Sequence, residues 1–270
     1  MNLLMTEMRR ALHRRAVRTL IAIALVGCAL AGVIAYLASA GKTLAELRLA
    51  EDSPAVMANW WIADDHVGVL SVGMFFLFLG GFFAGATVAG GEWRAGTITT
   101  VLSWEPRRLR LHGARLGSGA ILAFVISFGL QVVFLAAFVP AVVVNGTSDG
   151  VDGSFWLSLA VVMARTSVIT AAAAVLAMSL ATAARNTAFA VIALFAWVVV
   201  IEGLIRALKP SLSSWLWGET VTTVMSWARL DTVEVARSPL RSTATLAAYL
   251  AVIVGGAALS FKRRDIAAGT

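Results

Sequence analysis

The side chains that could carry out chemistry within the apolar parts of this chain are few. Cys28 is the single cysteine, and the three histidines, His13, His66 and His112, are far apart in sequence and fall outside the apolar runs. A lone cysteine cannot form an intrachain disulfide and provides no metal cage. We therefore expect no metal site and no cofactor in this chain.

Two partial motifs lack the residues that would make them functional. Residues 41–43 read Gly-Lys-Thr, as at the end of a phosphate-binding loop, but Tyr36 occupies the position of the required first glycine. Ser118 lies between two glycines, but no apolar run contains a histidine that could activate it. The sequence therefore predicts a protein that is not an enzyme and does not hydrolyse ATP by itself.

Arg165 and Glu202 are ionisable residues inside long apolar runs. A charge within a membrane is costly, so such residues are usually paired or functional. Their expected depths are compatible, and we predict an intramembrane charge pair. Contact with a substrate, or an arginine that extends outward to the interface, are the alternatives.

The segment 90–115 combines an apolar helical face with polar and basic residues. The apolar side chains that can share one face are Trp93, Ile98, Val101 and Leu102. Pro106 disfavours helix at the residue before it and ends the run. The segment thus predicts a short amphipathic helix followed by Arg107, Arg108 and Arg110. It either docks on a partner protein or lies on an anionic membrane surface.

These residues belong to a chain with the composition of an integral membrane protein. Of its 270 residues 59% are hydrophobic and 14% are charged, and the mean hydropathy is +0.84; soluble domains carry about 25% charged residues. Six runs are long enough to span a bilayer of about 30 Å. They cover residues 19–40, 67–89, 118–144, 155–183, 187–208 and 242–261. We predict an all-α fold with one transmembrane domain over residues 1–270.

The distribution of charge predicts the orientation. Most of the 22 Lys and Arg residues flank the spans on one side, which includes both termini and the loop 90–115. Basic flanks mark the cytoplasmic side, so we expect a multi-pass protein of the cell membrane with both termini in the cytoplasm. The net charge of +7 is explained by these flanks, and nucleic acid is not an expected partner.

Short helices at the membrane surface are expected outside the spans. The amino terminus places Leu4, Met8, Leu12 and Ala16 at four-residue spacing among basic residues, which is typical of an amphipathic helix on the inner leaflet. On the outside, the segments 41–66 and 209–241 contain apolar stretches that are too short to span, together with several tryptophans. Tryptophan favours the membrane interface, so these segments predict interfacial or re-entrant helices.

Gly81 and Gly85 fit a spacing of small residues that lets membrane helices approach closely. The same spacing can serve dimerisation. Packing within one subunit is the more common explanation and is the one we predict.

The loop 90–115 resembles the signature of type-2 ABC export permeases, the membrane subunits of ATP-binding-cassette transporters. The resemblance is carried by Glu92-Trp93-Arg94-x-Gly96-Thr97, Leu102, Pro106-Arg107-Arg108 and Arg115, together with the six-span layout. It implies that the loop docks on a separate ATPase subunit, which would bind ATP and Mg, and that two permease subunits form the pathway. The implied docking residues are Glu92, Trp93, Arg94, Gly96, Thr97, Ile98, Val101, Leu102, Pro106, Arg107 and Arg108.

Two other functions fit the same composition. An ion-coupled secondary transporter would use charged residues at the membrane midplane and often inverted repeats, and no clear self-similarity relates the two halves of this chain. A membrane sensor or assembly protein is the other alternative. A neighbouring gene for a soluble P-loop ATPase would favour the permease. The transported substrate stays open among drugs, lipids, peptides and glycans.

Overall fold

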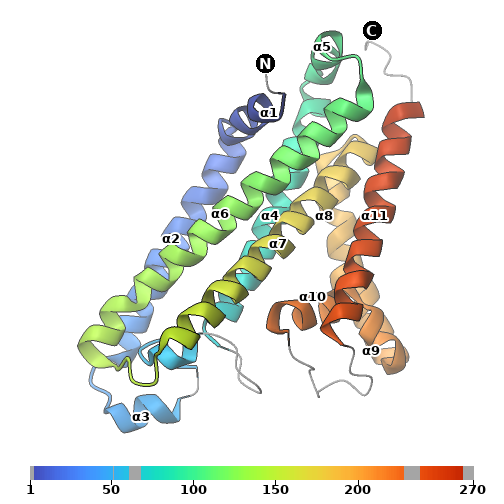
Figure 1. The fold of residues 1–270 in the computed structure, drawn as a ribbon. Coiled ribbons are helices and arrows are strands. Elements are labelled where there is room, and N and C mark those ends of the chain that lie inside the picture. The colour runs from blue at the N-terminus through green and yellow to red at the C-terminus, as the bar shows by residue number, and fades with distance from the viewer. Residues whose placement is uncertain (1–2, 51, 61–67, 228–237, 264–270) are drawn as a thin grey trace.

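The structure is a computed structural model that describes residues 3–50, 52–60, 68–227 and 238–263. The described residues form helices and no strand, and six helical segments are long and apolar enough to cross a membrane. These are α2 (Arg15–Ser39), α4 (Leu70–Arg94), α6 (Arg108–Asn145), α7 (Gly153–Ala184), the continuous segment of α8 (Thr187–Phe195), η2 (Ala196–Ile201) and α9 (Glu202–Leu208), and α11 (Pro239–Arg263). The protein is therefore an all-α, multi-pass membrane protein, as the sequence predicts (Figure 1).

The long helices extend beyond several of the predicted spans. Helix α4 continues through Arg94, and α6 begins at Arg108, well before the predicted start at residue 118. The connection between the two spans is therefore shorter than the predicted loop 90–115. The start of the second predicted span, at residue 67, lies outside the described residues. Helix α6 has 38 residues, and about 20 residues suffice to cross the hydrocarbon, so its first turns carry its basic residues out of the hydrocarbon.

Close approach of backbones organises the centre of the bundle. Helix α4 packs mainly along α7, and α2 packs mainly along α6. A Cβ atom on Gly81 or Gly85 would collide with backbone atoms of Thr170 or Ala174 of α7. The glycine spacing predicted for helix packing is thus used within the subunit.

Only three residues separate the fourth and fifth predicted spans, which predicts a tight turn, and the structure forms one there. Arg185 follows α7 with a left-handed backbone, φ 56°. The side-chain oxygen of Asn186 then accepts hydrogen bonds from the backbone N–H groups of Ala188 and Phe189, at 2.8 and 3.4 Å. These N–H groups have no partner within the helix, so the amide caps α8 and fixes the direction in which it leaves the turn.

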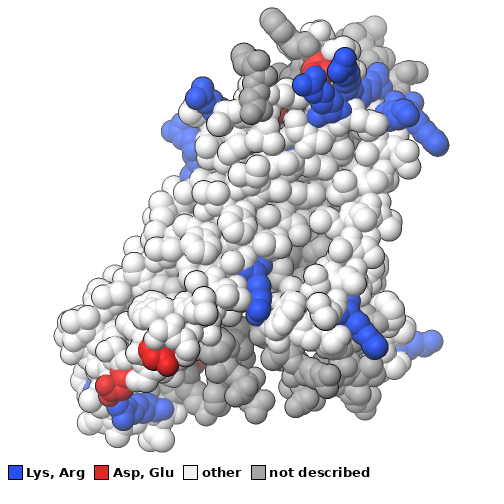
Figure 2. Space-filling model, in the orientation of Figure 1, with Lys and Arg blue, Asp and Glu red and all other residues white. Residues whose placement is uncertain are grey.

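Lys and Arg side chains gather at one end of the bundle and leave an apolar band below it (Figure 2). We call this end, formed by α1 (Leu3–Leu12), α5 (Thr97–Trp104) and the adjoining ends of α4, α6 and α11, the basic end. Helix α1 and the last turn of α11 both lie there (Figure 1). The opposite end carries α3 (Leu44–Leu49), η1 (Met57–Trp60), η3 (Pro210–Trp215) and α10 (Trp217–Ser226). These are the short non-spanning helices that the outer segments predict.

Candidate functional site

The predicted docking segment forms a tight connection between two spans at the basic end. Helix α4 ends at Arg94, and Gly96 follows with φ +66°, a left-handed backbone that glycine adopts without strain. Helix α5 then runs from Thr97 to Trp104, and Pro106 precedes the start of α6. The predicted short helix is therefore present, but Trp93 lies on α4 and not on it.

Side chains of the predicted apolar docking face make contacts within the subunit. The Trp93 ring meets the ring of Phe261 of α11 edge-on, with 6.3 Å between the two centroids. The Arg185 guanidinium lies over the Trp93 ring, 4.9 Å from its centroid. The side chain of Val101 lies outside the described part of the structure. Of the three described side chains of this face, that of Ile98 is buried and those of Trp93 and Leu102 are half-buried.

The surface that this connection presents is polar and basic. Five of the implied docking residues, Arg94, Gly96, Thr97, Pro106 and Arg107, are exposed, and Arg108 is half-buried. Thr97 belongs to α5, and Thr100 and Ser103 of the same helix are also exposed. A partner that contacts this connection would meet hydroxyls and guanidinium groups, which favour an acidic complementary surface.

Glu92 is at the centre of a buried ion-pair cluster. Its side chain is 5% exposed and its carboxylate lies 2.5 Å from Arg14, 3.9 Å from Arg10 and in direct contact with Arg115. Glu7 completes the cluster, 2.8 Å from Arg10 and 3.7 Å from Arg115. The expectation that Glu92 faces a partner is wrong, because this carboxylate already joins α1, the start of α2, α4 and α6.

Sequence reasoning did not find this cluster. Arg115 enters only through the family resemblance, and Arg10 and Arg14 belong to the basic residues of the predicted amino-terminal amphipathic helix. One signal was present: Glu7 is the only acidic residue in a strongly basic segment, and an acid there gains nothing from an anionic membrane. The structure buries Glu7 and Ala11 against the bundle, and α1 ends at Leu12, so Ala16 belongs to α2.

Glu202 is fully buried and binds the start of a short helix, not an arginine of another span. Its carboxylate accepts hydrogen bonds from the backbone N–H of Trp217 at 2.7 Å and of Gly218 at 3.0 Å, and from the Trp197 indole at 3.1 Å. Arg206 lies 3.6 Å away on the next turn. Glu202 therefore anchors the first turn of α10, whose free N–H groups and dipole favour an anion.

The predicted Arg165–Glu202 pair is wrong, since each residue contacts other groups. The Arg165 guanidinium lies over the ring of Trp227, 4.5 Å from its centroid, and the ring favours a cation at its face. Trp227 directly follows α10. Both charged residues thus hold the segment that contains α10, but they hold opposite ends of it.

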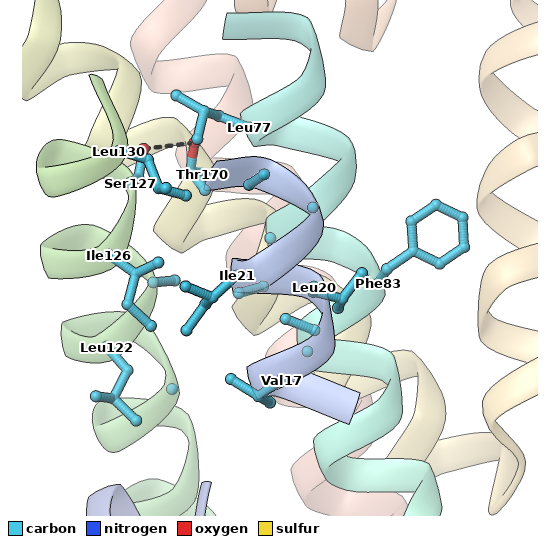
Figure 3. A pocket seen from close by; sticks show the side chains of 18 of the residues that line it. Val17, Leu20, Ile21, Leu77, Phe83, Leu122, Ile126, Ser127, Leu130 and Thr170 are labelled. Atoms are coloured by element: carbon cyan, nitrogen blue, oxygen red, sulfur yellow. Dashed lines mark hydrogen bonds between the residues drawn. The ribbon is translucent and has the colours of Figure 1, made fainter. Parts of the chain in front are cut away.

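A large apolar cavity extends from the ion-pair cluster into the bundle. Its volume is about 610 Å³, and residues of α1, α2, α4, α6 and α7 line it. Figure 3 shows aliphatic side chains of α2 and α6, including Leu20, Ile21 and Ile126, pointing into it. At the far end, the Ser127 hydroxyl lies 3.3 Å from that of Thr170.

The basic end holds a buried ion-pair cluster next to an exposed polar connection between two spans. The cavity beyond this cluster is lined mainly by apolar groups. In comparisons with known proteins, no protein-family model and no curated protein matches this chain.

Proposed function

We propose that this chain is the membrane-spanning permease subunit of an ABC exporter of the cell membrane, and that its basic end faces the cytoplasm. The observation that carries the proposal is the α4–α5–α6 connection. Its short helix is held directly between two spans, and its exposed residues are polar and basic. Two residues separate α5 from α4 and three separate it from α6, so a push on α5 would reach both spans over short connections, as a force-transmitting contact requires.

The buried cluster around Glu92 supports the same function. It ties α1 and α2 to the ends of α4 and α6 next to the docking connection. A displacement of α5 would therefore move four helices together rather than bend one loop. Energy would come from ATP and Mg bound by a separate ATPase subunit, because this sequence has no complete nucleotide-binding loop of its own.

Two permease subunits would form the translocation pathway with two ATPase subunits. The outward surface of this chain supports such an assembly, because α2 and the α8–α9 segment expose many large apolar side chains. Lipid or a second copy can cover such a surface. A homodimer is the simplest form of the assembly.

The experiment is co-purification of the ATPase with charge-reversed variants of the connection. Tagged chain should retain a protein that contains a complete P-loop sequence and hydrolyses ATP. Arg94→Glu and Arg107→Glu should reduce the retained ATPase about tenfold or more, the effect of about 1.4 kcal/mol. Arg9→Glu is the matched control, because Arg9 is exposed on α1 at the same end.

Three results would contradict the proposal. The wild-type chain could retain no ATPase, the two loop variants could retain as much as wild type, or all three variants could lose it equally. The first result, combined with transport driven by an ion gradient, would favour the secondary transporter.

A further inference from the structure

We propose that the cavity between α2, α4 and α6 binds one anionic membrane phospholipid, with an acyl chain inside the cavity and the headgroup at the arginines of the basic end. This inference does not depend on the ATPase. It concerns a resident lipid of the subunit and leaves the transported substrate open.

The interior of the cavity suits a hydrocarbon chain. Beyond the charged end, its lining is dominated by aliphatic and aromatic groups, such as Val17, Leu122 and Leu77, which point into it in Figure 3. Gly27 of α2 and Gly80 of α4 also line it, and a Cβ added to either would meet no atom within 4 Å. The glycines therefore border open space rather than a close helix contact.

The mouth of the cavity opens sideways, on the membrane-facing surface of the bundle. Three large side chains that line it, Ile23, Val72 and Phe76, are 63%, 60% and 66% exposed. They lie on α2 and α4, the two helices between which a chain would enter. A lipid in the surrounding bilayer can reach the cavity without leaving the hydrocarbon.

The charged end of the cavity selects the headgroup. Arg10, Arg14 and Arg115 line it together with Glu7 and Glu92, so the lining carries one cation in excess. The side chains of Arg10 and Arg14 are 37% and 24% exposed, while that of Arg115 is 11% exposed. Arg10 and Arg14 also pair with the glutamates, but a guanidinium has five N–H donors, so both can also donate to a phosphate at the membrane surface. Arg115 is more deeply buried between the two glutamates.

Charge and shape together favour a lipid over the other occupants. A soluble anion would satisfy the arginines but leave the aliphatic walls unfilled. A helix of a second copy would cover the mouth but has no need of the excess cation at one end. An anionic phospholipid matches both parts of the cavity at once.

The test uses nanodiscs of equimolar phosphatidylglycerol and phosphatidylcholine with identical acyl chains, followed by native mass spectrometry of the released protein. Wild type should retain one phosphatidylglycerol per chain in preference to phosphatidylcholine. Gly27→Leu and Gly80→Leu fill the open space and should each reduce retention about tenfold. Arg10→Gln should reduce the preference for phosphatidylglycerol about fivefold, the expected effect of one basic residue near the membrane surface.

Gly129→Leu is the matched control. Gly129 is exposed on α6, does not line the cavity and also has no atom within 4 Å of an added Cβ, so its variant should retain lipid as wild type does. Equal retention of the two lipids by wild type, or unchanged retention by both cavity variants, would overturn the proposal. So would efficient disulfide formation between two copies through a Phe76→Cys variant in a Cys28→Ala background, because the mouth would then be an interface between subunits.

Discussion

The guanidinium of Arg14 lies 2.5 Å from the carboxylate of Glu92, so the residue that precedes α2 is tied to the last turn of α4. The same carboxylate contacts Arg115 of α6. One buried acid thus determines how three helices meet at the basic end, beside the connection that we propose as the ATPase contact. A substitution of Glu92 therefore disturbs the packing of these helices, whatever its effect on a partner.

Glu92→Gln should strongly destabilise the protein. The substitution leaves Arg115 buried without its main counter-charge, and removing one partner of a buried ion pair typically costs about 3–5 kcal/mol. Thermal unfolding of the purified protein in mild detergent measures the loss. Glu105→Gln is the control, because Glu105 pairs at 3.2 Å with an arginine that is largely exposed, and such pairs contribute about 0–1 kcal/mol. Equal stability of the two variants would contradict the structural role of Glu92.

Glu202→Ala should release the first turn of α10 and destabilise the protein more than Glu202→Gln. Alanine leaves three donors without their acceptor, of which the Trp217 N–H is buried. An unsatisfied buried group costs about 1–3 kcal/mol, while glutamine keeps one acceptor oxygen. Protease cleavage within α10 and thermal unfolding would report the effect. Glu219→Ala is the control, since Glu219 is partly exposed and only its ion pair with Arg206, at 3.2 Å, is lost. The double variant Arg165→Glu/Glu202→Arg should be no more stable than Arg165→Glu or Glu202→Arg alone, because the two residues do not contact each other.

Gly85→Ala should destabilise the packing of α4 on α7, although alanine is the better helix former. The added methyl group would collide with the backbone of Ala174, and overpacking of a tight contact costs about 1–3 kcal/mol. Gly80→Ala is the control on the same helix, where the methyl group enters open space. Gly80→Ala should therefore be neutral or slightly stabilising in the same unfolding measurement. If Gly85→Ala were as stable as wild type, the prediction would fail, because α4 and α7 could then move apart without loss of stability.

Cysteine labelling on whole cells should place the basic end in the cytoplasm. In a Cys28→Ala background, cysteines at Ser148 and Ser211, both exposed at the opposite end of the bundle, should react with a membrane-impermeant thiol reagent. A cysteine at Ser103, which is exposed on α5, should react only after the cells are opened. Labelling of Ser103 from outside would reverse the proposed orientation.

The sequence by itself determined the six spanning segments, the short helices at both ends and the tight turn at Arg185. These features follow from local patterns: hydropathy over about 20 residues, the distribution of Lys and Arg, and the breakers Gly96 and Pro106. The glycine spacing at Gly81 and Gly85 likewise indicated a close helix contact, and the structure identifies α7 as its partner.

Only the tertiary structure decided which charged groups meet. Glu92 and Arg14 are 78 positions apart, and no local pattern states that the helices carrying them are neighbours. The predicted Arg165–Glu202 pair was wrong for the same reason: similar depth in the membrane does not make two side chains adjacent. A buried carboxylate binds whatever donors the packing brings to it, which are the first N–H groups of α10 for Glu202 and arginines of other segments for Glu92.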